Sequence, residues 1–399
     1  MNKVLLIFIS SLFCLMLYGA ENTKSDTPVN NNAGSSVSAE DETSSNVTAP
    51  FEQMKLGEWA PLFDTGLCIF PSMVISTATI NVTMDNAEQM QPRSGDWWGT
   101  VGIAVCSPRK DCPVKVEISG NVYIKPSKYK IILPEANLTY LIYPPLRYDY
   151  DKLLQIGQTT PEDLSFKVTI DNNEPDEEVF RFQVRPINDC VFYYVNAEGE
   201  ELDVGYFFAA YVNENHPGID KILQECLKNG KIDSFAGYYK TPQEVKSEIK
   251  AIWDTLAKKG IRYSSINTTS GEDERLAATH IRLLGETLNN TQANCADGSV
   301  MFASILRKLG LDVSLVLIPG HMFLYVNLDP EGKNPICIET TMIGTSSFEE
   351  AVEEGNKEFQ ESEKKFNPNE DDNGGYQIIN IAYARRMGIM PIKEVTNKN

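Results

Sequence analysis

One cysteine, one histidine and one glutamate follow each other along the chain at positions where they could carry out thiol chemistry. Cys295 stands at the start of a helical pattern, His321 starts a strand pattern, and Glu339 lies on the next strand. A thiol is weakly nucleophilic until a neighbouring base deprotonates it, and a histidine oriented by a carboxylate is such a base. We therefore expect Cys295 to act as nucleophile, His321 as base and Glu339 as the orienting acid.

The residues around Cys295 predict that a helix begins there. Asn294 can cap this helix, Asp297 can reach back from its first turn, and Gly310 can end it. A helix N-terminus carries unpaired N–H groups and a partial positive charge, and both favour a thiolate. The same N–H groups could receive the oxyanion of a tetrahedral intermediate.

Two strands must position the other two residues. The run 311–318 is almost entirely apolar, and a Pro-Gly turn follows it. Alternation on the next strand places His321, Phe323 and Tyr325 on one face. Glu339 belongs to the strand after that, so adjacent antiparallel strands would bring its carboxylate to the imidazole.

The remaining histidines have no comparable setting. His216 precedes a proline in a loop, and His280 lies in a stretch that we predict to be helical. No group of histidines and cysteines has the spacing of metal ligands. We therefore expect neither a metal site nor a cofactor.

The segment NCADGSVMFASILRKLGLDVSLVLIPGHMFLYV resembles the core of the transglutaminase-like superfamily, which shares the papain-like cysteine-peptidase fold. The family pattern is a cysteine that opens a helix, a strand, a histidine that starts a second strand, and an acid on the third. Cys295, His321 and Glu339 match these positions, although the family usually has aspartate at the last. The likeness is closest over residues 290–345, extends in outline over 205–399, and leaves out the N-terminal strands.

The resemblance implies acyl transfer at an amide bond of a protein or peptide substrate, through a thioester on Cys295. Water would resolve the thioester in a peptidase or amidase, and an amine would do so in a protein-glutamine acyltransferase. We favour hydrolysis, because exported bacterial members of the family more often look hydrolytic. Two other classes stay open: a catalytically silent scaffold or binding protein of the cell envelope, and a carbohydrate- or peptide-binding module fused to a degenerate enzyme.

The N-terminus has the pattern of an export signal. In residues 1–20, Lys3 precedes an apolar run that is shorter than the roughly 20 residues of a membrane span. A lipoprotein anchored at Cys14 is the less favoured alternative, because the neighbouring residues fit poorly. Residues 21–50 are polar and predict a disordered linker. We expect a periplasmic or secreted protein without an integral membrane segment after cleavage.

The rest of the chain predicts an α+β fold in two domains. Residues 51–203 contain short strands separated by Pro, Gly, Asn and Asp, which is typical of an antiparallel β-sandwich-like domain. We interpret this domain as a binding, docking or spacer module that could meet a cell-envelope partner. Residues 204–399 form the transglutaminase-like domain, with helices predicted at 241–260 and 273–288 and a strand leading into a short helix at 376–389.

Charge and cysteine content add two expectations. The net charge of −19 argues against nucleic-acid binding, which needs clustered Lys and Arg. Export permits disulfides, and cleavage after residue 20 would leave seven of the eight cysteines, so at least one thiol would stay unpaired. The candidate pairs are Cys106 with Cys112 and Cys68 with Cys190, whereas we expect Cys226 and Cys337 to be either buried small apolar groups or partners of one another.

Overall fold

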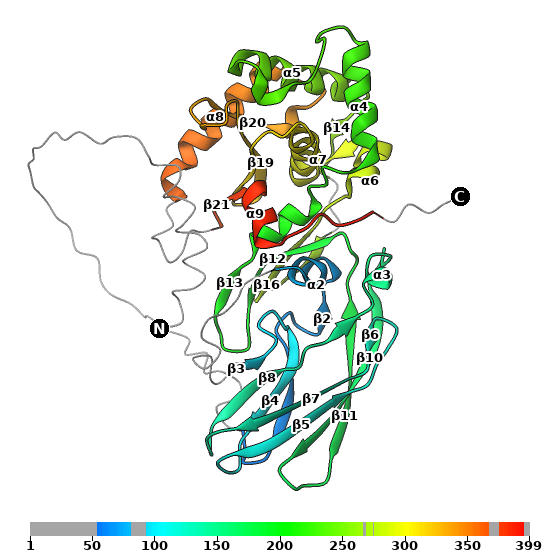
Figure 1. Cartoon of the computed structure of the whole chain (residues 1–399), viewed down its shortest axis with the longest axis vertical. Coiled ribbons are helices and arrows are strands. Elements are labelled where there is room, and N and C mark those ends of the chain that lie inside the picture. Colours follow the sequence, from blue (N-terminus) through cyan, green and yellow to red (C-terminus); the bar gives the residue numbers. More distant parts are fainter. Residues whose placement is uncertain (1–53, 81–92, 266–268, 274, 367–374, 395–399) are drawn as a thin grey trace, which may run out of the picture.

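The computed structural model has a mixed α+β fold, which confirms the predicted fold class (Figure 1). It describes residues 54–80, 93–265, 269–273, 275–366 and 375–394. The predicted signal peptide and linker lie outside the described residues. Within the described part of the chain, no helix combines the length and the apolar character needed to cross a membrane.

Two sheets that share one core make up the N-terminal part. The first has the order β1-β4-β8-β3 and consists of β1 (Trp59–Phe63), β4 (Val101–Cys106), β8 (Thr139–Tyr143) and β3 (Arg93–Gly95). The second has the order β2-β11-β10-β5-β7 and consists of β2 (Cys68–Ile69), β11 (Asp176–Val184), β10 (Thr160–Ile170), β5 (Cys112–Ile118) and β7 (Ser127–Leu133). Alternate residues of β5 are buried, as predicted, and pack with residues of β4 from the other sheet.

The pairing in these sheets is antiparallel except at two short strands. The β2–β11 and β3–β8 pairs are parallel, which differs from the purely antiparallel expectation. A small ladder joins β6 (Ile124–Lys125) to β9 (Arg147–Tyr148). Two short helices, α2 (Pro71–Thr77) and α3 (Tyr150–Leu153), interrupt the strands.

A third sheet connects the two halves of the molecule and corrects two sequence assignments. Its order is β13-β12-β16-β15, formed by β13 (Glu201–Asp203), β12 (Asp189–Val195), β16 (Leu276–His280) and β15 (Thr269–Asp273). The predicted helix at 273–288 is therefore wrong over its first half, and only α6 (Leu284–Asn290) is helical. Leu and Ala favour helix locally, but pairing with β12 overrides this weak preference.

This sheet also bears on the predicted domain boundary. Strands β12 and β13 precede residue 204, yet they share a sheet with β16, which follows it. Buried residues of β12 pack in the same core as the 3-10 helix η2 (Gly205–Tyr211) and the C-terminal helices. The division at 203/204 stays a prediction.

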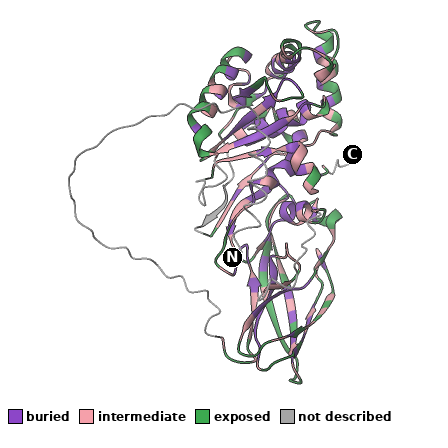
Figure 2. Ribbon diagram, turned by 60° about the vertical axis from the view of Figure 1, so that its left-hand side comes forward, coloured by how far each residue is buried: buried purple, intermediate pink, exposed green. Residues whose placement is uncertain are grey.

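The C-terminal half is built on an antiparallel sheet of order β20-β19-β18-β21. Figure 2 shows buried residues concentrated in this sheet and in the helix beside it. The strands are β20 (Pro335–Ile338), β19 (His321–Asn327), β18 (Val313–Ile318) and β21 (Gln377–Asn380). The predicted strand and short helix near the C-terminus are β21 and α9 (Ile381–Met387).

Helices cover this sheet and extend the core. They are α4 (Pro217–Lys228), α5 (Pro242–Lys258), α7 (Cys295–Lys308) and α8 (Phe348–Ser362), with the 3-10 helices η3 (Gly237–Tyr239), η4 (Thr340–Met342) and η5 (Glu363–Lys365). Helix α5 begins with a capping box of Thr241 and Glu244, within the helix predicted at 241–260. The face of β19 that carries Met322 and Leu324 packs in the core of α7. The opposite face, with Phe323, forms a smaller cluster that includes Phe359 of α8.

Candidate functional site

Helix α7 begins at Cys295, as the sequence predicts, because two neighbours close its first turn. The Asn294 side chain accepts a hydrogen bond from the Asp297 N–H at 2.8 Å, and the Asp297 carboxylate accepts one from the Asn294 N–H at 3.1 Å. The preceding strand β17 (Gln292–Ala293) pairs with β14 (Arg262–Tyr263), which fixes the entry of the chain. The Cys295 thiol is half-buried at this helix N-terminus.

A buried ion pair holds the same turn in place. The Asp297 side chain is fully buried and receives a hydrogen bond from Nη1 of Arg282 at 2.5 Å. The backbone N–H of Arg282 donates to the other carboxylate oxygen at 2.7 Å. A buried carboxylate needs such partners, because desolvating a charge costs several kcal/mol. Arg282 thus ties the segment before α6 to the start of α7.

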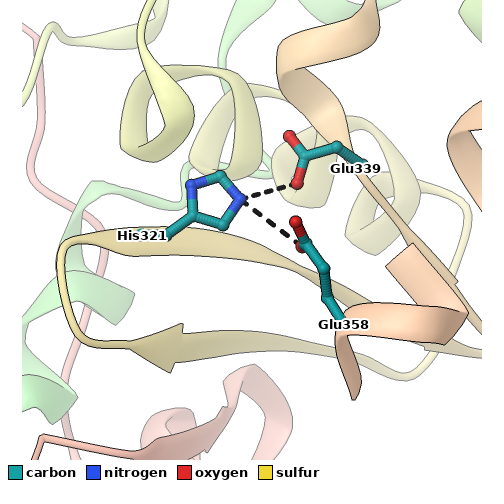
Figure 3. Close-up of side chains that lie close together, drawn as sticks. All are labelled: His321, Glu339 and Glu358. Atoms are coloured by element: carbon teal, nitrogen blue, oxygen red, sulfur yellow. Dashed lines mark hydrogen bonds and ion pairs between the residues drawn. The ribbon is translucent and has the colours of Figure 1, made fainter. Parts of the chain in front are cut away.

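His321 and Glu339 meet on the other side of the site (Figure 3). Nε2 of His321 lies 2.6 Å from Oε2 of Glu339. The second oxygen of Glu339 accepts hydrogen bonds from the Thr341 N–H at 2.8 Å and from the Thr341 hydroxyl at 2.5 Å. Both oxygens of this buried carboxylate are therefore occupied, and its orientation is determined.

The position of Glu339 differs slightly from the prediction. The β19–β20 ladder ends with Leu324 opposite Ile338, and Glu339 then begins η4 instead of continuing the strand. The carboxylate consequently reaches His321 diagonally from the end of the ladder and not from a position directly opposite. The expected pairing of the two side chains is nevertheless present.

The imidazole of His321 also interacts with the thiol. The Cys295 side chain is one of the groups that raise the pKa of His321, so the thiol lies beside the imidazole. Since Nε2 faces Glu339, Nδ1 is the ring nitrogen left for the sulfur (Figure 3). The structure thus brings Cys295, His321 and Glu339 together in the order that the sequence predicts, with the imidazole in the middle.

Electrostatics favour the charged form of this histidine. Burial lowers the pKa of His321, but its interactions with Cys295, with the hydrogen-bonded Glu339 and with the nearby Glu358 carboxylate outweigh burial and raise the pKa well above its ordinary value. Burial likewise raises the pKa of Glu339, but its hydrogen bonds with His321 and Thr341 and the histidine charge hold it below its ordinary range. At neutral pH the pair is therefore an imidazolium beside a carboxylate.

A second carboxylate, which the sequence reasoning missed, reaches the same histidine. Oε2 of Glu358 in α8 lies 3.6 Å from Nε2 of His321. The periodicity of α8 could have revealed it. Ala351 and Gly355 are buried on one face, and Glu358 follows them at helical spacing. Glu358 therefore lies on the same face of α8 as these buried residues.

These three side chains are also a potential metal-binding group, although the sequence predicts none. One ligand atom each from His321, Glu339 and Glu358 lies within 4.8 Å of the others. Imidazole and carboxylates are ligands that zinc accepts. A metal ion would have to displace the hydrogen bond between His321 and Glu339, so the protonated pair is the arrangement that this geometry favours.

The hydroxyl groups of Ser299 and Thr340 connect the elements around the site. The Ser299 hydroxyl donates to the Met322 carbonyl at 3.2 Å and lies 3.0 Å from the Thr340 hydroxyl. The Thr340 hydroxyl, which has a single proton for Ser299 or the Cys295 carbonyl, lies 3.5 Å from that carbonyl. These contacts link α7, β19 and η4, the three elements next to Cys295, His321 and Glu339.

The other histidines lie elsewhere. His216 accepts a hydrogen bond from the Gly218 N–H at 3.1 Å and so caps α4. His280 lies in strand β16, not in a helix, and its Nδ1 is 3.1 Å from Oδ1 of Asp189. Both histidines therefore have structural partners other than Cys295.

The expected disulfides are not formed. The seven cysteines of the described residues make no disulfide with one another. Cys106 and Cys112 lie on β4 and β5, in different sheets, which is why the short spacing does not close a hairpin. Burial raises the pKa of the Cys337 thiol to about 12 and also raises that of Cys226, so these two thiols are suited to a core role.

A hollow of about 730 Å³ lies on the N-terminal half, away from this site. It is lined by residues of β5, β7, β10 and β11 and by the turn before β9. Its charged side chains have both signs: Glu117, Lys128, Arg147, Lys167 and Glu177.

Comparison with known proteins adds little. No family model and no curated protein matches the chain. A solved structure described as a "putative cysteine protease" from Cytophaga hutchinsonii is similar with 13% sequence identity and a TM-score of 0.20, over 59% of this chain and 73% of that chain. A TM-score this low does not establish a common fold, so the functional argument rests on the geometry of the site.

Proposed function

We propose that the protein is an exported, cysteine-dependent acyl-transfer enzyme of the transglutaminase-like kind, which acts on amide bonds and favours hydrolysis. One observation carries the proposal: the imidazole of His321 interacts with the Cys295 thiol and is hydrogen-bonded to the Glu339 carboxylate. Such an arrangement deprotonates a thiol and orients the base that does so.

The first half-reaction forms a thioester. The Cys295 thiolate attacks the carbonyl carbon of the amide, and the carbonyl electron pair moves to oxygen. N–H groups at the start of α7 are suited to receive the resulting oxyanion. When the intermediate collapses, the C–N bond breaks and the leaving amine takes a proton from His321.

The second half-reaction releases the acyl group. Water attacks the thioester while neutral His321 accepts one of its protons. The C–S bond then breaks, the carboxylic acid leaves, and the sulfur returns to the thiolate beside the imidazolium. An amine in place of water would give transamidation through the same steps, and the preference for water comes from the family resemblance.

The N-terminal sheets are the candidate docking part of this enzyme. Their hollow, with charges of both signs, supports a role in binding a cell-envelope partner outside the cytoplasm. The second candidate function, a catalytically silent scaffold, would use the same surface without the thiol.

The deciding experiment is alkylation of the purified full chain with iodoacetamide at about pH 6, with the modified peptides identified by mass spectrometry. A thiolate held by His321 should react at least about tenfold faster than an ordinary thiol, which is mostly protonated at this pH. Cys68, the other half-buried cysteine, is the internal standard, and Cys68→Ala is the matched control for Cys295→Ala.

Two further assays separate the outcomes. A peptide library should be cleaved by the wild type and by Cys68→Ala but not by Cys295→Ala, whereas incorporation of a fluorescent amine would report cross-linking. If Cys295 is alkylated as slowly as Cys68, and neither peptide cleavage nor amine incorporation is detected, the result would favour the catalytically silent scaffold.

A further inference from the structure

We propose that Glu358 is a second positioning residue for His321, which faces Nε2 together with Glu339 and keeps the imidazole charged beside Cys295. The proposal rests on the function proposed above, because a charged imidazole serves the thiol only if Cys295 is the nucleophile. Figure 3 shows both carboxylates directed at the same ring nitrogen from different elements.

The buried carboxylate oxygen of Glu358 lies near one positively charged group, the imidazolium of His321. Its Oε2 atom is inaccessible to solvent and has no hydrogen-bond partner among the described residues. An isolated buried carboxylate oxygen is costly, so a compensating charge is expected nearby. The Nε2 atom of His321, 3.6 Å away, supplies it when the ring is protonated.

Two facing carboxylates make the neutral imidazole unfavourable. One carboxylate oxygen of Glu339 and one of Glu358 lie within 4.8 Å of each other, and a ring nitrogen of His321 lies within the same distance of both. Like charges at this distance repel, and a positive charge between them removes the repulsion. Loss of the histidine proton would therefore leave the two carboxylates opposed, which contributes to the raised pKa of His321 together with its interaction with Cys295.

The other charged or titratable groups around Glu358 do not offer the same compensation. Cys337 of β20 faces it with a buried thiol whose pKa is raised mainly by burial and also by Glu358. On α8 itself, the Lys357 ammonium lies near Glu358 and Glu361 but forms its hydrogen bond with Glu354 at 2.8 Å. His321 is the cation that approaches the buried oxygen.

The fold holds Glu358 in this position. The Cys337 N–H donates to the Asn356 side chain at 2.8 Å, and the Glu339 N–H donates to the Ala351 carbonyl at 3.0 Å. Both bonds fasten α8 to the free edge of β20. Glu358 and Glu339 are consequently fixed relative to each other and to the histidine.

The test is an NMR titration of the His321 ring, carried out on the full chain in the Cys295→Ala background with EDTA present. In this background the midpoint belongs to the imidazole and does not depend on any activity. Glu358→Gln should lower the midpoint by about one pH unit or more, a tenfold loss of proton affinity. Glu358→Asp should restore part of it, and Glu361→Gln, an exposed acid one turn further on α8, should leave it unchanged.

Three results would overturn the proposal. An unchanged midpoint in a folded Glu358→Gln variant would make Glu358 a structural residue. A midpoint that falls equally in Glu358→Asp and Glu358→Gln would mean that the charge is not responsible. A difference between wild type and Glu358→Gln that arises only when zinc replaces EDTA would identify Glu358 as a metal ligand instead.

The titration midpoint of His321 tests the role of Glu358 independently of the proposed enzyme activity. If Cys295 is not selectively alkylated, the enzyme proposal fails even though the His321 midpoint still responds to Glu358. If Cys295 is alkylated but the midpoint does not respond, only the role of Glu358 fails. With an identified substrate, the basic limb of the kcat/KM profile should move to lower pH in Glu358→Gln by the same amount as the midpoint.

Discussion

Gly355 of α8 lies directly against the backbone of Cys337 in β20. A Cβ atom at position 355 would be 2.8 Å from the carbonyl carbon of Cys337 and 2.8 Å from the amide nitrogen of Ile338. Real side chains do not approach a backbone this closely, so only glycine permits the contact. The close approach is what allows α8 to present Glu358 to the histidine.

Gly355→Ala should therefore destabilise the protein despite a better helix propensity. Alanine gains up to about 1 kcal/mol in a helix interior, but overpacking against a rigid backbone costs about 1–3 kcal/mol. We expect a net loss in urea unfolding and a lower His321 titration midpoint. Gly157→Ala is the control, because nothing lies within 4 Å of a Cβ at that exposed position. Equal stability of the two variants would contradict the close contact.

The cap of α7 should affect both stability and the thiol. Asn294→Ala removes the acceptor of the Asp297 N–H, which should cost about 1 kcal/mol. Because the first turn loosens, alkylation of Cys295 should slow as well. Thr241→Ala removes the corresponding cap of α5, so it should lower stability in urea unfolding without changing the alkylation rate. An unchanged alkylation rate of Cys295 in Asn294→Ala would show that the helix cap does not affect the thiol.

Breaking the ion pair between Arg282 and Asp297 should be strongly destabilising, because the carboxylate is buried. Arg282→Met leaves the fully buried Asp297 without its cation, which should cost about 3–5 kcal/mol of unfolding free energy. Chemical denaturation can measure this loss. Arg181→Met breaks an exposed ion pair with Asp163 on the N-terminal sheet and should change stability far less. Similar losses in the two variants would show that Asp297 finds another partner.

A buried carboxyl in the N-terminal half should make stability depend on pH. Burial raises the pKa of Asp64 to about 6, above the ordinary value of 3.8, against the lowering effect of Arg93 and the Tyr143 hydrogen bond. The folded state then binds a proton more tightly than the unfolded state. The resulting stabilisation is present below about pH 4 and is lost as the pH rises through about 6.

Asp64→Asn should remove this dependence while keeping an acceptor for the Tyr143 hydroxyl, which bonds Asp64 at 2.8 Å. Relative to the variant, the wild type should lose roughly 2 kcal/mol between about pH 4 and pH 6, because the slope stays below its limit of about 1.4 kcal/mol per unit near each pKa. Unfolding curves across this range measure the difference. Asp163→Asn, at an exposed carboxylate, should show no such loss, and a parallel pH profile of wild type and Asp64→Asn would exclude the effect.

Local features of the chain were readable from the sequence because their determinants lie within a few residues. The start of α7 depends on Asn294 and Asp297, which are three residues apart and bond to each other. The alternation after the Pro-Gly turn assigned the two faces of β19 in the same way. The order of Cys295, His321 and Glu339 predicted a set of side chains that the fold does bring together.

Tertiary structure decided the features that depend on distant partners. The segment 276–280 became a strand because β12 offers a hydrogen-bonded edge, which outweighs a helix preference of a few tenths of a kcal/mol per residue. Cys106 and Cys112 went to different sheets, so their short spacing along the chain was irrelevant to pairing. Glu358 reached His321 only because α8 packs on the edge of β20. Periodicity can indicate which face of a helix is buried, but the identity of its neighbour depends on contacts between elements far apart in sequence.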